Sequence, residues 1–149
     1  MSFPNYYEGR VVWIDNEENF WVRYSSYMVS SSFDSILIAG LGIGAMPYWV
    51  NANTTCSIID VVEFNEDVIS ACNDIGHLDS SINVIQDDIL TYIPSRNYDL
   101  IVLDTWWDGV PCQDEIDTEK PQLITKYREY LNEDGALFIP IDGTVVEKE

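Results

Sequence analysis

The stretch that decides the fold of this 149-residue chain is Ile36-Leu37-Ile38-Ala39-Gly40-Leu41-Gly42-Ile43-Gly44-Ala45-Met46-Pro47. An aliphatic run leads into three glycines at alternate positions, which let the backbone turn tightly and bring its N–H groups close to a ligand. Pro47 suits the first turn of a helix, where its missing N–H costs nothing. The stretch predicts a strand, a glycine turn and a helix, with a plain tight turn as the alternative to a ligand-binding one.

Short apolar runs of the same kind recur along the chain. They occupy residues 35–39, 57–62, 82–85, 100–103 and 136–139. Their length and their β-branched and aliphatic composition are typical of buried parallel strands.

Amphipathic segments lie between these runs. Residues 65–73 place Val68, Ile69 and Cys72 on one helical face, and Asn65 suits the N-cap. Residues 120–131 form another such segment, which we expect to end at the turn 132–135. With a helix in every crossover, the order predicts an α/β fold: a doubly wound, parallel, Rossmann-like sheet with its ligand beyond the carboxyl ends of the strands.

The length predicts a single domain over residues 1–149. Residues 1–34 are expected to form an N-terminal hairpin or lid, with Arg10–Ile14 and residues 20–24 as its strands and residues 15–19 as the turn. Residues 35–149 are expected to form the Rossmann-like core.

An acid follows the glycine turn at a distance typical of nucleoside-binding folds. Glu63 ends the second apolar run, nineteen residues beyond Gly44, and a carboxylate there can accept both hydroxyls of a ribose. The alternative is that Glu63 only caps the following helix. NAD is a second ligand compatible with the glycines, but the chain is too short for a further hydride-acceptor domain, which favours S-adenosylmethionine (SAM).

Four segments, in order, resemble the successive motifs of class I SAM-dependent methyltransferases. Within that superfamily, their sequences are most similar to the spermidine synthase branch. They are Gly40-x-Gly42-x-Gly44, Ile58-Ile59-Asp60-Val61-Val62-Glu63-Phe64-Asn65, Val84-Ile85-Gln86-Asp87-Asp88-Ile89-Leu90-Thr91-Tyr92-Ile93 and Tyr98-Asp99-Leu100-Ile101-Val102-Leu103-Asp104. The resemblance covers roughly residues 35–141. It implies that Gly40, Gly42 and Gly44 pass beneath the methionine part and the ribose, and that Glu63 holds the ribose hydroxyls.

The resemblance also implies roles for acids after the third and fourth runs. Asp88 would accept from the adenine amino group, with adjacent Asp87 as the alternative, and Ile89 would pack on the ring. Asp104 would face the sulfonium and the acceptor, where an acid offsets positive charge.

The stretch after the fourth run departs from the spermidine synthase pattern Asp-Ser-Ser-Asp-Pro. It is Asp104-Thr105-Trp106-Trp107-Asp108-Gly109-Val110-Pro111, which makes Asp104 and Asp108 the candidate catalytic acids. The sequence predicts a methyltransferase acting on a small cationic or neutral acceptor. Its alternatives are an aminopropyltransferase using decarboxylated SAM on a polyamine-like substrate, and a protein that binds or degrades SAM without transfer.

The net charge and the composition limit the classes of molecule that this protein could bind. Seven Lys and Arg residues against 26 Asp and Glu residues give a net charge of −19, which argues against a nucleic-acid partner. The acids suit either a cationic partner or a solvated, high-salt surface. Three cysteines without metal-ligand spacing predict no metal site and a reduced compartment, and the sequence shows no leader and no membrane span. We therefore expect a cytoplasmic protein.

The end of the chain leaves room for only a few residues after residues 136–139. We expect the terminal antiparallel strand pair of the family to be missing and this strand to have a bare edge. A bare edge invites pairing with another chain, so the sequence predicts a homo-oligomer.

Overall fold

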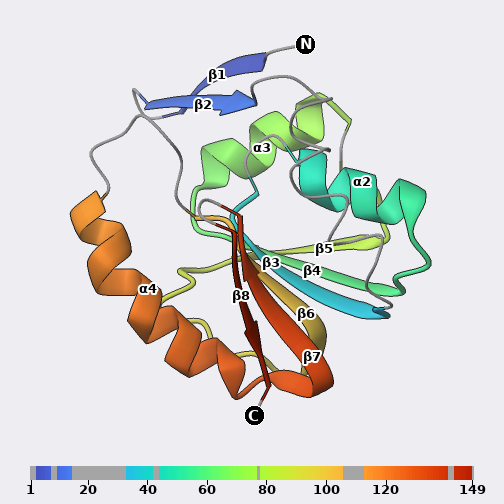
Figure 1. Ribbon diagram of the computed structural model, residues 1–149. Helices are drawn as coiled ribbons and strands as arrows, with labels where there is room; N and C mark the ends of the chain where they lie inside the picture. The colour runs from blue at the N-terminus through green and yellow to red at the C-terminus, as the bar shows by residue number, and fades with distance from the viewer. Residues whose placement is uncertain are drawn as a thin grey trace.

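The central sheet is built around strand β3 (Ser35–Ala39), all five residues of which are buried. The computed structural model describes residues 3–7, 10–14, 33–41, 44–76, 78–105, 113–140 and 143–148 (Figure 1). The sheet has six strands in the order β5-β4-β3-β6-β7-β8. Strands β4 (Ile58–Glu63), β5 (Ile82–Gln86), β6 (Tyr98–Leu103) and β7 (Leu131–Ile139) run parallel to β3, and β8 (Thr144–Glu147) runs antiparallel to β7. The predicted doubly wound α/β sheet is confirmed.

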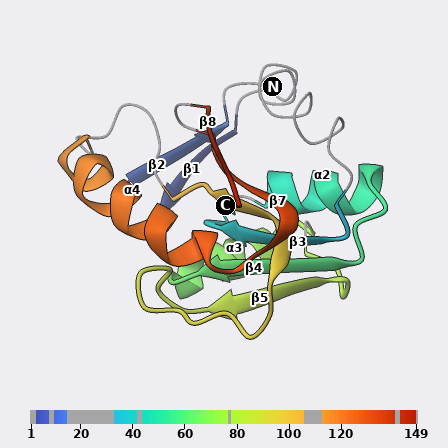
Figure 2. The same ribbon diagram turned by 60° about the horizontal axis from the view of Figure 1, so that its bottom comes forward.

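Helices cover both faces of the sheet (Figures 1 and 2). Helices α2 (Ala45–Asn53) and α3 (Glu66–Asp74) bury Val50 and Cys72 against one face. Helix α4 (Gln113–Arg128) buries Leu123 and Tyr127 against the other. Because both faces are covered, burial is continuous rather than alternating in the central strands: all five residues of β3 and the last five of β4 are buried. In the part of the chain that the structure describes, no helix combines the length and apolar character needed to cross a bilayer.

The strand order reverses between β3 and β6. The chain passes from β3 to β4 and β5 on one side, then returns to β6 and β7 on the other. At such a point the loops after the two central strands diverge, and a ligand crevice opens beyond their carboxyl ends. The turn after β3 and the residues after β6 therefore frame the candidate site.

Helix α3 begins as the sequence predicts. The Asn65 side chain accepts a hydrogen bond from the backbone N–H of Asp67 at 2.9 Å, which satisfies one of the unpaired donors of the first turn. Val68 and Cys72 are buried on its inner face, whereas Ile69 is partly buried.

The crossover between β5 and β6 contains no helix, so the prediction of a helix in every crossover is wrong here. Residues 87–97 are all described and form turns. Asp88 starts a single turn by accepting from the Leu90 N–H at 2.9 Å. Pro94 then lacks an N–H and disfavours the helical conformation at Ile93, so the turn does not extend into a helix.

The N-terminal segment contains a hairpin in which Arg10–Ile14 pairs with the residues that precede it. Strand β1 (Phe3–Tyr7) pairs antiparallel with β2 (Arg10–Ile14), and the pair is a sheet of its own. Arg10–Ile14 is thus a strand as expected, but its partner precedes it in the chain. The predicted partner, residues 20–24, and the predicted turn, residues 15–19, lie outside the described residues.

The carboxyl-terminal strands also differ from the prediction. Helix α4 ends at Arg128, and the predicted turn 132–135 lies inside β7, where Asp134, not Gly135, adopts the left-handed conformation (φ 65°). The expected bare edge on residues 136–139 is wrong, because four residues suffice for β8 to pair with them. Strand β8 is then the outer strand of the described sheet, and pairing with a second copy stays a prediction.

Candidate functional site

The glycine turn packs backbone to backbone against the end of β6. The N–H of Gly40 donates to the Val62 carbonyl at 2.9 Å, and the N–H of Asp104 donates to the Ala39 carbonyl at 2.8 Å. Gly40 has φ +97°, and a Cβ atom at this position would overlap the carbonyl oxygen of Asp104. Only glycine fits both restraints, so the turn after β3 and the backbone of Asp104 are held together at the carboxyl end of the sheet.

Glu63 connects this turn to the next strand and helix. One carboxylate oxygen, Oε1, accepts from the Leu41 N–H at 3.0 Å, and the other, Oε2, accepts from the Asn65 N–H at 3.1 Å. The residue is only 9% exposed. A carboxylate offers about four acceptor positions, so two remain for hydroxyl donors from a ligand. Glu63 thus stabilises the start of α3, as expected if it caps this helix. Its remaining acceptor positions also allow it to hold a diol.

The acids after β5 lie at the same edge of the sheet. The N–H of Asp87 donates to the carbonyl of Glu63 at 3.2 Å, which joins the ends of β4 and β5. Both Asp87 and Asp88 are exposed. Ile89 is partly buried and packs against the core on the α4 side of the sheet.

Asp104 is half-buried, and no described residue donates a hydrogen bond to its carboxyl group. Burial raises the pKa of Asp104 from 3.8 to about 7. The described residues supply its carboxylate with no hydrogen bond, and the next side chain, Thr105, has a buried hydroxyl without a partner in this same part of the chain. A carboxyl group titrating near neutrality beside an unsatisfied hydroxyl is typical of a functional site.

Phe64 is a candidate site residue that the sequence analysis did not single out. It directly follows Glu63 at the carboxyl end of β4, and its ring is 66% exposed. The sequence did contain a signal for it. Phe64 is a large aromatic residue between the end of a buried strand and the N-cap of a helix, where the chain leaves the core. Its exposure places an apolar surface next to the Glu63 residue in the chain.

Two of the predicted site residues, Gly42 and Asp108, lie outside the described residues. The others gather at one edge of the sheet, where the ends of β3, β4, β5 and β6 meet. They are Gly40, Gly44, Glu63, Asp87, Asp88, Ile89 and Asp104. Gly44 has φ +80° and precedes α2 as its N-cap. Within the described ranges no group of His, Cys, Asp and Glu side chains is arranged to hold a metal ion.

No protein-family model and no curated protein sequence matches the chain. Solved structures do match. The N-methyltransferase NodS from Bradyrhizobium japonicum WM9 superposes with a TM-score of 0.65 over 85% of this chain at 20% identity. Coclaurine N-methyltransferase, solved with N-methylheliamine and S-adenosylhomocysteine (SAH), gives 0.61 over 83% at 20% identity. The glycopeptide N-methyltransferase MtfA gives 0.61 over 83% at 12% identity.

These likenesses concern the fold. This chain spans 70% of the length of NodS, 53% of MtfA and 35% of coclaurine N-methyltransferase. The chain therefore has the Rossmann-like fold of class I SAM-dependent methyltransferases, and the predicted methyltransferase type of sheet is confirmed.

Proposed function

We propose that this crevice binds SAM and that the chain transfers the methyl group to a small acceptor. One observation carries the proposal: Glu63 lies in hydrogen-bond contact with the glycine turn, which itself packs against Asp104. A ribose acceptor, a turn with backbone N–H groups and a carboxyl group at the reacting end are thus adjacent. The shared fold of the methyltransferases described above supports the same conclusion.

The residues present fit the adenosine half of SAM. The remaining acceptor positions of Glu63 suit the two ribose hydroxyls. The exposed ring of Phe64 offers an apolar surface for adenine, and Asp87 or Asp88 can accept from its amino group. The missing side chain at Gly40 leaves room for the ligand to approach the backbone.

The sulfonium half of SAM suits the end of β6. The carboxylate of Asp104 offsets a positive charge, and Thr105 has a buried hydroxyl to offer to the ligand or the acceptor. When bound, SAM supplies an electrophilic methyl group on its sulfonium. Asp104, with a pKa of about 7, is roughly half ionised at neutral pH and can take up the proton that an amine acceptor releases.

We propose a small nitrogen nucleophile as the acceptor. The net charge of −19 favours a cationic or neutral molecule over a nucleic acid. The three proteins compared above are all named as N-methyltransferases, and a group that accepts a proton near neutral pH suits an amine. Methyl transfer from a sulfonium otherwise needs mainly in-line positioning.

Aminopropyl transfer from decarboxylated SAM is the finer alternative that the sequence motifs leave open. The sequences of the four motifs and the acidic composition of the chain support aminopropyl transfer. Against it stand the altered stretch after Asp104 and the methyltransferase neighbours. Calorimetry with SAM and decarboxylated SAM separates the two proposals, since a methyltransferase should bind SAM more tightly. Preference for the decarboxylated compound, with spermidine formed from putrescine, would replace methyl transfer by aminopropyl transfer.

The binding proposal is tested by calorimetry with SAH. We expect the wild-type protein to bind SAH and the Glu63→Gln variant to bind it about tenfold or more weakly, because ribose hydroxyls lose a charged acceptor. Glu66→Gln is the matched control, since Glu66 is an exposed acid in the first turn of α3. Equal affinity of Glu63→Gln and wild type, or NAD binding in place of SAH, would overturn the proposal.

Catalysis is tested separately from binding. Incubation of the protein with methyl-labelled SAM and a panel of small amines should give labelled amine, with Asp104→Asn slower. Binding of SAH without labelled product from any amine, or release of methylthioadenosine with no acceptor present, would favour a SAM-binding or SAM-degrading protein instead.

A further inference from the structure

The turn that follows β5 is held from beneath by helix α4. The hydroxyl of Tyr127 donates to the carbonyl of Ile89 at 2.6 Å and reaches that of Tyr92 at 3.5 Å. The Nζ of Lys126 donates to the carbonyl of Leu90 at 3.0 Å and lies 3.4 Å from that of Ile89. Two neighbouring residues of one helix thus bind three carbonyls of one turn.

These hydrogen bonds from Tyr127 and Lys126 stabilise a crossover that contains no helix of its own. Residues 88–92 form a single turn in which the Asp88 carbonyl accepts from the N–H groups of Thr91 and Tyr92. A lone turn is weakly stable because most of its carbonyls have no partner within it. Tyr127 is fully buried and supplies that partner from a rigid helix, so the turn is fixed by tertiary contacts.

Charge acts in the same direction. Burial lowers the pKa of Lys126, and Asp87 and Asp88 counteract this effect by favouring its charged form. The Lys126 ammonium also lies 5.1 Å from the centre of the Tyr127 ring. A cation close to the turn reduces the electrostatic repulsion between the two adjacent carboxylates, Asp87 and Asp88.

We infer that Tyr127 and Lys126 are positioning residues for adenine recognition: from α4 they hold the turn that bears Asp87 and Asp88. The inference rests on the proposed function, in which one of these acids accepts from the adenine amino group. An acceptor fixed before binding loses less conformational freedom when the ligand arrives, which increases affinity without any direct contact. The inference therefore assigns part of the nucleoside specificity to a helix on the opposite face of the sheet from α2 and α3 (Figure 2).

The experiment compares two ligands that differ at C6 and N1 of the purine, where inosine has an oxo group in place of the amino group and an N–H in place of the ring nitrogen acceptor. SAH and its inosine analogue, S-inosylhomocysteine, are titrated into wild type, Tyr127→Phe and Lys126→Met. We expect each variant to weaken SAH binding about three- to tenfold, the contribution of one hydrogen bond, and to change the affinity for the inosine analogue much less. A general loss of structure would weaken both ligands by the same factor.

Matched controls exist on the same helix and just beyond it. Lys120→Met removes an ammonium that bonds to Thr144 on β8, and Tyr130→Phe removes a hydroxyl from the ring next to Tyr127. Neither should change the ratio of the two affinities. The inference would be overturned if Tyr127→Phe and Lys126→Met left the ratio of SAH affinity to inosine-analogue affinity unchanged, or if wild type bound the two ligands equally well. In both cases, SAH binding would still support the proposed function. A wild type that binds neither ligand overturns both.

Discussion

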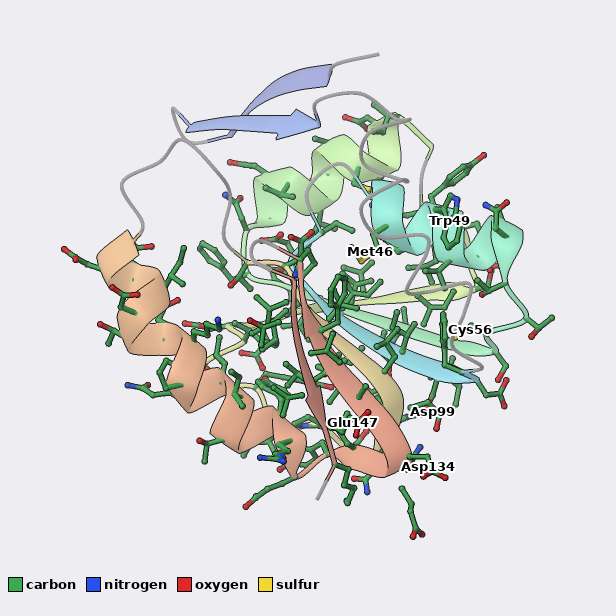
Figure 3. The ribbon with its side chains drawn as sticks, viewed as in Figure 1. Met46, Trp49, Cys56, Asp99, Asp134 and Glu147 are labelled. Carbon is green, nitrogen blue, oxygen red and sulfur yellow. The ribbon has the colours of Figure 1, made fainter. Side chains whose placement is uncertain are left out.

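The two ends of strand β6 carry the same residue type in opposite states. Asp99 lies near the amino end (Figure 3). It accepts from the N–H of Asp34 at 2.8 Å, from the N–H of Ser35 at 3.3 Å and from the Asn132 side chain at 2.9 Å. Burial raises the pKa of Asp99, but these donors outweigh it and hold the pKa below 3.8. Asp104, just beyond the carboxyl end, has no such donors among the described residues, and burial raises its pKa to about 7.

The difference distinguishes acids that hold the fold together from acids that are available to a ligand. At the amino end, each acid is used to hold elements together: Asp99 joins β3, β6 and β7, and Asp60 accepts from Tyr98 at 2.5 Å and from Asn83 at 3.1 Å. At the carboxyl end, the buried hydroxyl of Thr105 has no partner among the described residues, and burial raises the pKa of Asp104. Natural proteins retain such groups where a ligand completes them.

The largest effect is expected at Gly40. Gly40→Ala places a Cβ against the backbone of Asp104 at φ +97°, so we expect about 3 kcal/mol of destabilisation and loss of SAH binding. Gly143→Ala is the control: Gly143 has φ +75° but nothing within 4 Å of the added Cβ, so only the strain of about 1 kcal/mol remains. Urea unfolding and calorimetry measure both. Equal stability of the two variants would show that the contact with Asp104 is not needed.

Asp104→Asn should reduce the rate and stabilise the protein. We expect a loss of about a hundredfold in kcat/KM, and wild-type kcat/KM rising with pH and levelling off above about 7. Because the folded pKa is raised, the carboxyl group destabilises the fold increasingly as pH rises from 3.8 to about 7.

Replacing this carboxyl group should therefore increase the free energy of unfolding by about 2 kcal/mol at pH 8 and by little at pH 4, after allowing for the partial exposure of the residue. Urea unfolding at the two pH values measures this difference. A variant less stable than wild type at pH 8 would contradict the contrast between the two ends of β6.

Asp99→Asn should act in the opposite direction. We expect a loss of about 1 kcal/mol at pH 7, because two backbone donors and Asn132 lose their charged acceptor. The folded pKa is lowered, so the stabilisation is present above 3.8 and is lost as pH falls below that value. Thermal unfolding from pH 7 to pH 3 should show wild type and variant converging at acid pH, with ligand affinity unchanged at pH 7. A constant difference across this range would refute the role given to Asp99.

The smallest effect on stability is expected at Phe64. The ring is 66% exposed, so Phe64→Ala should leave the thermal midpoint nearly unchanged. SAH affinity should fall about fivefold or more, because adenine loses an apolar surface. Ile75→Ala, which removes an exposed apolar side chain after α3, is the control and should leave SAH affinity unchanged. Identical affinities in the two variants would remove Phe64 from the site.

Features that depend on neighbouring residues could be predicted from the sequence. The apolar runs fixed the parallel strands, the glycines fixed the turn after β3, and Asn65 fixed the start of α3, because strand burial, backbone freedom and capping act within a few residues. The position of Glu63 at the carboxyl end of β4 also followed from strand length alone.

Only the tertiary structure decided how distant segments complete one another. The turn after β5 stays a turn because Tyr127 and Lys126 bind its carbonyls from 36 to 38 residues away. Strand β2 pairs with β1, which precedes it in the chain, and the short segment Thr144–Glu147 becomes a strand because β7 offers it a partner. The pKa values of Asp99 and Asp104 likewise depend on burial and donors from other strands, which no local pattern specifies.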